Sequence, residues 1–329
     1  MPILLNEDDL SPLLIDPAHM DELLTLVEAS LRDFNSGRVG GQVRLETSLL
    51  DAKKKYRIMT SAVPGAGQGM RISALFRGPK DAYFILLFDG ERGDFLALIA
   101  GKSLNIWRTG APAGVASRYL APAGADRLGL IGSGRQARGQ ALALCRALPT
   151  LKQIKIFSQT PANRRRFADE MSSWLDIAVE PVDSAREAVV NMPIVSLATS
   201  GRAPVIEPQW IASGALVVSI TSGQLPRATV SGSRIIVSWL EEVLGGEGPR
   251  QPYHDMMADG SWSADRIVGE LGEVILGKLP ARSKEEETVV FESAGMAVWD
   301  STAAAWAYRW AVTQQKGLPF SLEEFGSKQ

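Results

Sequence analysis

The sequence of 329 residues predicts an α/β protein in two parts, one with a parallel sheet and one with a largely antiparallel sheet. From Val43 to Ala100, short apolar or alternating runs are separated by tight turns, a pattern typical of antiparallel strands. After Leu128, short apolar runs alternate with helical segments along most of the remaining chain. That alternation predicts βαβ units and a doubly wound parallel sheet, because parallel strands need a crossover connection.

The antiparallel part is expected to begin with a helix. Asp16 can cap its first turn, Pro17 suits the first helical position, and Gly37 suits its end. Between them, apolar residues recur at helical spacing, at Leu23, Leu24, Val27 and Leu31. Strands are then expected, for example over Tyr56–Val63, Met70–Phe76, Ala82–Phe88 and Phe95–Ala100.

The parallel part is expected to begin with a phosphate-binding turn. The apolar strand Leu128–Ile131 stops at Gly132, and Gly134 follows two residues later. A helical pattern then begins, and Pro149 ends it. Gly132 permits a tight turn, and Gly134 lets backbone N–H groups approach a pyrophosphate at the helix start. With Ala137 at the third position of the G-x-G-x-x-G/A fingerprint, the stretch predicts a Rossmann-type dinucleotide-binding domain.

Further strands and helices complete the parallel part. We expect strands over Gln153–Phe157, Ile177–Val179, Ile194–Ala198, Leu216–Ile220 and Arg234–Ser238, with helices after Pro161 and over Ser184–Val190. The segment Gly245–Asp265 is rich in glycine and proline and is expected to be a loop. The helix Ser301–Gln315 is expected to return to the antiparallel part. The predicted domains are therefore residues 1–112 with 300–329, for substrate binding and dimerisation, and the inserted dinucleotide-binding residues 113–299.

The composition is that of an ordinary globular protein, with 45% apolar and 22% charged residues. A formal net charge of −2 disfavours a nucleic-acid partner. No apolar run reaches membrane-spanning length, and the first residues lack the pattern of a signal peptide, so we expect a cytoplasmic protein without a membrane partner. Cys145 lies on an apolar helical stripe and is expected to be a buried structural thiol. His19 and His254 have no partner at metal-ligand spacing, so no metal site is expected.

Several stretches of the chain together resemble one known family. From Trp107 to Ala121, Arg-Thr precedes a run of small residues, and Leu128 to Arg138 follows with Gly-x-Gly-x-Gln. Thr199-Ser200 after a strand and the segment from Phe291 to Asp300 extend the pattern. In these stretches the chain resembles the ornithine cyclodeaminase/mu-crystallin family. The resemblance implies a Rossmann domain inserted into an α/β domain that forms a homodimer, and NAD(P)-dependent chemistry at the carbon next to an amino-acid carboxylate.

The resemblance also implies three candidate catalytic arginines. Arg44 and Arg108 match the family arginines that hold the substrate carboxylate, and guanidinium groups suit that task. Arg71 stands where the family has a catalytic lysine. Because a guanidinium keeps its proton, we expect Arg71 to orient or polarise the reacting carbon, with Met59 also in the substrate site. Val230 stands where cyclodeaminases have an aspartate, which disfavours ornithine cyclisation.

The choice of cofactor depends on the residues after the second parallel strand. NAD sites usually place an acidic residue there to accept hydrogen bonds from the ribose. Ser158, Gln159 and Thr160 include no acid, and Arg164 lies within reach at the helix start, so the sequence favours NADP(H) over NAD(H). The nicotinamide is expected near Thr199, Ile220 and Ser293. The other residues assigned to the cofactor are Thr109, Gly132, Gly134, Arg135, Gln136 and Ser200.

Three functional hypotheses follow from these residues. The preferred one is an NAD(P)H-dependent oxidoreductase that acts on a C=N or C–N bond next to a carboxylate, as imine reductases, ketimine reductases and amino-acid dehydrogenases do. Its substrate would be a small imine, 2-oxo acid or amino acid. The second is the cyclodeaminase reaction, which regenerates NAD and releases ammonia and would need a carboxylate such as Asp300 or Glu270 in the site. The third is a non-catalytic protein that binds NADP(H).

Overall fold

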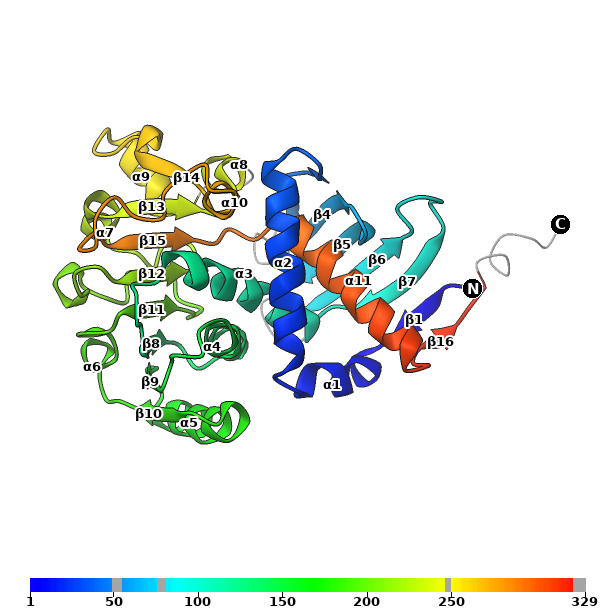
Figure 1. Ribbon diagram of the computed structural model, residues 1–329, viewed down its shortest axis with the longest axis horizontal. Coiled ribbons are helices and arrows are strands. Elements are labelled where there is room, and N and C mark those ends of the chain that lie inside the picture. Colours follow the sequence, from blue (N-terminus) through cyan, green and yellow to red (C-terminus); the bar gives the residue numbers. More distant parts are fainter. Residues whose placement is uncertain (49–54, 76–80, 246–249, 322–329) are drawn as a thin grey trace.

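The computed structural model describes residues 1–48, 55–75, 81–245 and 250–321. These residues form two halves, each built on an eight-stranded sheet (Figure 1). One sheet is parallel and the other largely antiparallel, so the α/β architecture predicted from the sequence is confirmed.

The parallel sheet spans the middle of the chain. Its spatial order is β10 (Ala178–Pro181), β9 (Gln153–Phe157), β8 (Arg127–Ile131), β11 (Ile194–Leu197), β12 (Leu216–Ser219), β15 (Val289–Glu292), β13 (Arg234–Val237) and β14 (Ile267–Glu270). From β8 the chain continues through β9 and β10 on one side, then crosses to β11 and β12 on the other. Such a reversal leaves a crevice at the carboxyl ends of the strands. The arrows of β12, β13 and β15 point toward the antiparallel half (Figure 1).

The antiparallel sheet combines the two ends of the described chain. Its order is β16 (Leu318–Pro319), β1 (Ile3–Leu5), β7 (Phe95–Ala100), β6 (Ala82–Phe88), β5 (Gly67–Leu75), β4 (Lys55–Val63) and β2 (Gly40–Gly41), with β3 (Leu45–Ser48) also paired to β4. The β1–β7 pair is parallel, and the other pairs are antiparallel. Of the predicted strand Met70–Phe76, Phe76 lies outside the described residues.

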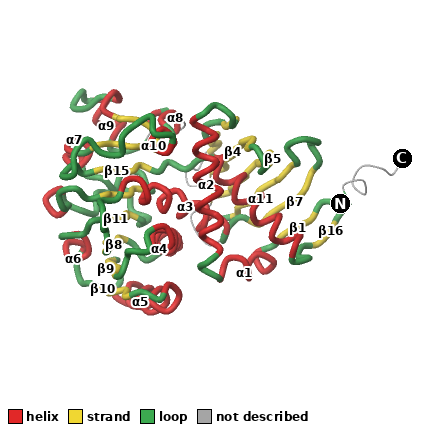
Figure 2. The backbone as a smooth tube through the Cα atoms, in the orientation of Figure 1, coloured by secondary structure: helices red, strands yellow, loops and turns green. Residues whose placement is uncertain are grey.

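The longer helices are α1 (Glu7–Ile15), α2 (His19–Asn35), α3 (Leu104–Leu120), α4 (Arg135–Ala147), α5 (Pro161–Leu175) and α11 (Ala297–Thr313). The shorter ones are α6 (Ala185–Val189), α7 (Arg227–Gly232), α8 (Leu240–Leu244), α9 (Tyr253–Ala258), α10 (Leu271–Ile275) and the 3₁₀ turns Pro208–Trp210 and Ala264–Arg266. Figure 2 shows α2 and α11 side by side although they come from opposite ends of the chain. Helix α11 packs against β4 and β5, so the late helix returns to the early sheet as expected.

The structure corrects two expectations about secondary structure. The segment Gly245–Asp265 is not all loop, because its described part contains α9. Pro252 at the N-cap and the buried side chains of Tyr253 and Met256 explain this short helix, which needs no long periodic pattern. The segment from Glu7 to Ile15, for which no helix was expected, forms α1 with Asn6 in a capping box.

Close packing of α3 against α4 connects the two halves. A Cβ atom added to Gly110 of α3 would lie 2.1 Å from the carbonyl oxygen of Gly139 in α4. A Cβ atom added to Gly139 would lie 2.4 Å from the carbonyl oxygen of Ile106. The small residues that precede the glycine turn therefore let the two backbones touch. The predicted domain boundaries, at residues 112/113 and 299/300, fall within α3 and α11 and stay a prediction.

The described helices include none that combines the length and the apolar character needed to cross a membrane. Cys145 lies on α4, partly buried, and burial raises the pKa of its thiol to about 12. A thiol with so high a pKa is a poor nucleophile at neutral pH.

Candidate active site

The first of two adjoining cavities lies at the point where the strand order of the parallel sheet reverses. It has a volume of about 1020 Å³ and opens at the carboxyl ends of β8, β9 and β11. Nine of the residues assigned to the cofactor from the sequence line it, namely Gly132, Gly134, Arg135, Gln136, Ser158, Gln159, Thr160, Thr199 and Ser200. They come from three separate loops, and the fold brings them together as the fingerprint predicts.

The glycine turn leaves backbone atoms accessible on one wall of this cavity. Gly132 has φ +119°, and a Cβ atom there would lie 2.4 Å from the carbonyl oxygen of Ala198. Gly134 is the N-cap of α4 and has no side chain that could cap the helix. Nothing lies within 4 Å of the place where its Cβ would stand. The first N–H groups of α4 thus face open space, which suits a pyrophosphate.

A buried acceptor supports a bound group at this place. Gln136 lies in the first turn of α4. Among the residues that the structure describes, no group donates a hydrogen bond to its side-chain oxygen, Oε1. The atom is buried, and Gln136 lines both cavities. A buried polar atom of this kind calls for a partner, and the hydroxyl or amide groups of a dinucleotide would supply one. The glycine cradle and Gln136 therefore fit a nicotinamide dinucleotide.

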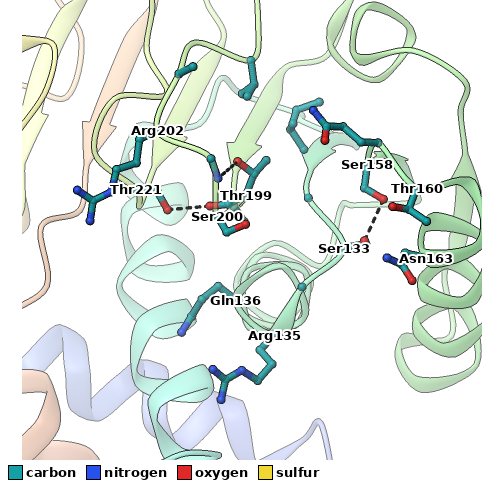
Figure 3. A pocket seen from close by; sticks show the side chains of 18 of the residues that line it. Ser133, Arg135, Gln136, Ser158, Thr160, Asn163, Thr199, Ser200, Arg202 and Thr221 are labelled. Atoms are coloured by element: carbon teal, nitrogen blue, oxygen red, sulfur yellow. Dashed lines mark hydrogen bonds between the residues drawn. The ribbon is translucent and has the colours of Figure 1, made fainter. Parts of the chain in front are cut away.

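The rim at the end of β9 is polar and uncharged. Ser133 donates from its hydroxyl to Ser158 Oγ over 2.9 Å, and Thr160 and Asn163 lie beside them (Figure 3). Arg164 is not among the lining residues. Its buried guanidinium pairs with Asp183 and donates to the carbonyl oxygen of Ser158 over 3.1 Å. In this structure Arg164 stabilises the backbone of the rim at Ser158 and does not face the cavity.

On the opposite side, a hydrogen-bond network fixes the loop that follows β11. Thr221 donates from Oγ1 to the carbonyl oxygen of Thr199 over 3.1 Å, as Figure 3 shows. Gln224, which is fully buried, donates from Nε2 to the same carbonyl oxygen over 2.8 Å and to that of Gly201 over 2.9 Å. Thr199 is thereby held at the mouth of the cavity, close to Ser200 and Arg202.

The second cavity lies between the two sheets and has a volume of about 540 Å³. The four residues assigned to the substrate line it, namely Arg44, Met59, Arg71 and Arg108. Thr109, Ile220 and Ser293, which were assigned to the cofactor, line it as well. Both cavities share Gln136 and Thr221, so a cofactor in the first would extend to the edge of the second.

Asp300 lies between two of the arginines. Nη1 of Arg71 donates to the two carboxylate oxygens of Asp300 at 3.2 and 3.3 Å, and Nε of Arg108 lies 3.0 Å from Oδ1. All three side chains are at least nine-tenths buried. One carboxylate thus serves two guanidinium groups, which leaves a net positive charge facing the cavity.

Arg44 has its own carboxylate. Its Nη2 atom lies 3.0 Å from Oε1 of Glu242 and donates to the carbonyl oxygen of Ala294 over 2.7 Å. A Cβ atom added to Gly295 would lie 3.4 Å from Nη2 of Arg44 and 3.6 Å from Nη1 of Arg108. The two guanidinium groups therefore converge on one glycine, where the missing side chain leaves room for a substrate carboxylate.

Burial makes these cations electrostatically strong. It lowers the pKa of Arg108 to about 9, against the opposing effect of Asp300, and lowers that of Arg44 to about 10, against the opposing effect of Glu242. Both values lie above neutral pH, so both groups stay charged. A carboxylate entering this site would relieve the mutual repulsion of the arginines, and its attraction to them would be little screened by water.

Sequence reasoning did not single out several cavity residues. Lys55, Arg57 and Tyr83 line both cavities, and the Arg71 guanidinium lies 5.2 Å from the centre of the Tyr83 ring. The period-two spacing of Lys55, Arg57 and Met59 along one strand was a signal that they share a face. Val230 lies on α7, is buried in the hydrophobic core and lines neither cavity.

The comparison with protein families agrees with this geometry. The model of the ornithine cyclodeaminase/mu-crystallin family matches residues 15–315. The chain belongs to this family, and the prediction made from Trp107–Ala121 and Leu128–Arg138 is confirmed.

Individual relatives share about a quarter of their residues with this chain. The delta(1)-pyrroline-2-carboxylate reductase of Bacillus thuringiensis subsp. konkukian is 27% identical over 312 residues, covering 91% of this chain and 94% of the relative. The ketimine reductase mu-crystallin of Macropus fuliginosus is 27% identical over 297 residues, covering 87% and 91%. The solved structure of the Thermococcus litoralis delta(1)-pyrroline-2-carboxylate reductase, in complex with NADH and L-proline, matches with a TM-score of 0.89 and 29% identity, covering 97% of this chain and all of the other.

Proposed function

We propose that this protein is an NAD(P)H-dependent oxidoreductase that reduces a C=N bond next to a carboxylate. The observation that carries the proposal is the arrangement of Arg71, Asp300 and Arg108 beside a dinucleotide-type cavity. It offers a buried positive site for a carboxylate at the edge of the place where a nicotinamide would lie. The relatives named as pyrroline-2-carboxylate and ketimine reductases support the same class of reaction.

The side chains of the substrate cavity would bind and orient the imine. When bound, the reduced nicotinamide cofactor supplies a hydride. Arg44 and Arg108, whose guanidinium groups both approach Gly295, hold the carboxylate, which fixes the carbon next to it. Arg71 adds positive charge and draws electrons from the C=N bond. Carboxylates already hold all three guanidinium groups in place without a ligand, so little reorganisation is needed when the hydride is transferred.

The origin of the proton follows from the charge of Arg71. A guanidinium in the usual position of the family's lysine keeps its proton, so Arg71 binds and polarises without acting as an acid. A protonated imine needs only the hydride to become an amine. A neutral imine takes one further proton from water. The buried carboxylate of Asp300 lies between two guanidinium groups and is engaged in holding them.

The cyclodeaminase reaction is the weaker candidate. Its aspartate is replaced by Val230, which is buried away from the cavities. Asp300 does reach the site, but both of its oxygens accept hydrogen bonds from Arg71. Glu270 caps α10 and hydrogen-bonds to Asn35, and it lines neither cavity. The described residues therefore offer no carboxylate that is free to handle a side-chain amine.

For the cofactor, we propose that NADP(H) is preferred to NAD(H). Ser158, Gln159, Thr160 and Asn163 form the rim where the adenosine ribose would lie, and they carry no negative charge. Among the described residues that line the cofactor cavity, the one acidic residue is Asp81, which comes just before β6 in the other half of the molecule. A 2′-phosphate would therefore meet hydroxyl and amide groups without repulsion.

We also propose that the protein forms a homodimer and acts in the cytoplasm, where the NAD(P)H pools are. One row of side chains crosses the face of the antiparallel sheet opposite the cavity, through the paired residues Leu45, Ile58, Ile72 and Phe84. Leu45, Ile58 and Phe84 are 53%, 40% and 46% exposed. An apolar row of this kind supports a partner surface. Light scattering after gel filtration should give twice the mass of the chain, and a monomer would contradict the proposal.

The reaction is tested by following nicotinamide absorbance with purified protein and candidate substrates. The panel contains five- and six-membered cyclic imine carboxylates, and 2-oxo acids with ammonia or methylamine. Oxidation of NADPH or NADH with any imine, but not with the 2-oxo acid alone, is the expected result. Cofactor binding without oxidation, together with release of ammonia from ornithine, would replace the proposal with the cyclodeaminase reaction. Binding with neither reaction would leave a non-catalytic protein.

A further inference from the structure

The substrate cavity carries more positive charge than a single carboxylate needs. Seven cationic residues line its described part, namely Arg44, Lys55, Arg57, Arg71, Arg108, Arg202 and Arg250. The carboxylates that pair with these cations are those of Glu46, Glu242, Glu292 and Asp300. Three positive charges therefore remain without a carboxylate in the described part of the chain.

The surplus is divided between separate places. Arg44 pairs with Glu242, and Arg250 pairs with Glu292, so each of these is balanced. One surplus charge belongs to the two arginines that share Asp300, where the first carboxylate is expected. A second belongs to Lys55 and Arg57, which share Glu46 as their only carboxylate among the described residues. A third belongs to Arg202, which lines both cavities.

Strand register places the second charge on the same face as the first. Met59 pairs with Arg71 across β4 and β5, and Arg57 pairs with Ser73 one row away on that face. In the same row, Glu46 lies opposite Arg57 and Tyr83 lies opposite Ser73. Rows on one face are two residues apart, which is about 7 Å at the rise of an antiparallel strand. Both charges thus lie along one wall of the cavity at a distance that a short substrate can span.

The Arg57 side chain is available to a ligand. Its Nε atom donates to Oε2 of Glu46 over 2.5 Å, and that contact fixes the orientation of the guanidinium group. Its two Nη atoms donate to none of the residues that the structure describes, and a quarter of the side chain is exposed. Lys55 pairs through its ammonium group with the other carboxylate oxygen of Glu46, and the Glu46 side chain is 5% exposed. A pair of free guanidinium N–H groups suits a carboxylate.

We infer that the substrate is an imine with two carboxylates, formed from a short 2-oxo dicarboxylic acid. The inference rests on the proposed imine reduction. One carboxylate, next to the C=N carbon, is held by Arg44 and Arg108, and the distal one is held by Arg57 with Lys55. The bound reduced cofactor would supply a hydride to the C=N carbon and become oxidised, and the nitrogen, protonated beforehand or by water, would become an amine. The distal carboxylate is unchanged and decides only which imine binds.

The test compares two 2-oxo acids of equal chain length that differ in the distal group. The substrates are 2-oxoglutarate and 2-oxopentanoate, each with ammonia and the cofactor. We expect the kcat/KM of the wild-type protein to be at least about tenfold higher for the dicarboxylate, because truncating a charged contact costs at least that much. Arg57→Met should remove this preference, and Arg57→Lys should keep most of it. Arg92→Met, an exposed arginine in the β6–β7 turn, should leave the ratio unchanged.

A binding measurement separates the possible outcomes. With cofactor present, 2-oxoglutarate should raise the unfolding temperature of the wild-type protein more than 2-oxopentanoate does, and Arg57→Met should abolish the difference. Equal kcat/KM and equal thermal shifts for the two acids would overturn the distal site while leaving imine reduction intact. So would an Arg57→Met variant that loses cofactor affinity and keeps its substrate ratio, since Arg57 would then contact the cofactor. Absence of hydride transfer to every imine would overturn the proposed function and this inference with it.

Discussion

The two cavities of this protein are shaped to bind anions by different means. In the cofactor cavity, the anion site is backbone, with Gly132 and Gly134 leaving N–H groups bare at the start of α4. In the substrate cavity, the anion site is built from side chains, with Arg44, Arg71 and Arg108 held by buried carboxylates from distant parts of the chain. The first site needs backbone N–H groups that no side chain covers. The second needs charges that are fixed by buried carboxylate partners.

This difference explains what each cavity can tolerate. A backbone site keeps its function when neighbouring side chains change, but it is lost when a methyl group blocks the turn. A charge site tolerates changes of shape but loses its function when one charge is removed, because the partner charge is then buried without compensation. Substitutions in the two cavities should therefore fail in different measurable ways.

The largest effect is expected for Arg108→Met. This change removes one of the two guanidinium groups that face the substrate carboxylate and leaves Asp300 with Arg71 alone. We expect kcat/KM for the imine to fall about 10³-fold, or ~4 kcal/mol, with little change in cofactor affinity. Steady-state kinetics and cofactor titration measure the two quantities. Arg108→Lys, which keeps the charge but not the fork, should lose less. A variant with near-normal kcat/KM would remove Arg108 from the substrate site.

The pair Gly132→Ala and Gly134→Ala tests the backbone site. Gly132→Ala forces alanine into φ +119° and against the carbonyl oxygen of Ala198, so the unfolding free energy should fall by about 1–3 kcal/mol or more and cofactor binding should be lost. Gly134→Ala has open space and a φ of −84°, so the stability of the free protein should hardly change. Cofactor affinity should still fall, because the methyl group takes the place of the pyrophosphate. Unchanged affinity in Gly134→Ala would place the pyrophosphate elsewhere.

A smaller effect is expected at the rim of the cofactor cavity. Ser158→Asp adds a carboxylate at the end of β9, where the 2′-phosphate of NADP(H) would lie. We expect NADPH affinity to fall about tenfold relative to NADH, or ~1.4 kcal/mol, through repulsion in a partly hydrated site. Ser158→Asn is the matched neutral control. If both cofactors weaken equally in Ser158→Asp, the proposed preference for NADP(H) is wrong.

The smallest effect on binding is expected for Arg164→Met. In this structure the guanidinium pairs with Asp183 and supports the carbonyl oxygen of Ser158, so its loss should lower the unfolding free energy by about 1–2 kcal/mol. NADPH affinity should change by less than about threefold, because no contact across the cavity is lost. Chemical denaturation and cofactor titration together decide the matter. A selective loss of NADPH affinity would show that Arg164 binds the 2′-phosphate, as the sequence suggested.

The backbone site could be predicted from the sequence because it is local. Gly132, Gly134 and the start of α4 lie within a few residues of one another, and the strand before them is a plain apolar run. The placement of Ser158 and Thr199 in the same cavity also followed, because parallel strands end at one edge of a sheet.

The charge site could be predicted only in part. Arg44, Arg71 and Arg108 were found through family resemblance, but the carboxylates that orient them come from α8 and α11. Contacts between residues about 200 positions apart leave no pattern in the local sequence, so the role of Glu242 was not foreseen. Arg164 shows the converse, since a suitable charge at a suitable spacing is turned toward Asp183 by packing that the sequence does not reveal.

Transfer of deuterium from the nicotinamide to the substrate would decide whether this protein reduces a C=N bond next to a carboxylate. Reduced cofactor labelled at the transferred position is incubated with the wild-type protein and an imine carboxylate, and the product is examined by mass spectrometry and NMR. We expect one deuterium on the carbon that bears the carboxylate, and a greatly reduced yield with Arg108→Met. Absence of label from every product, while the labelled cofactor binds in the glycine cradle, would contradict the proposed reduction.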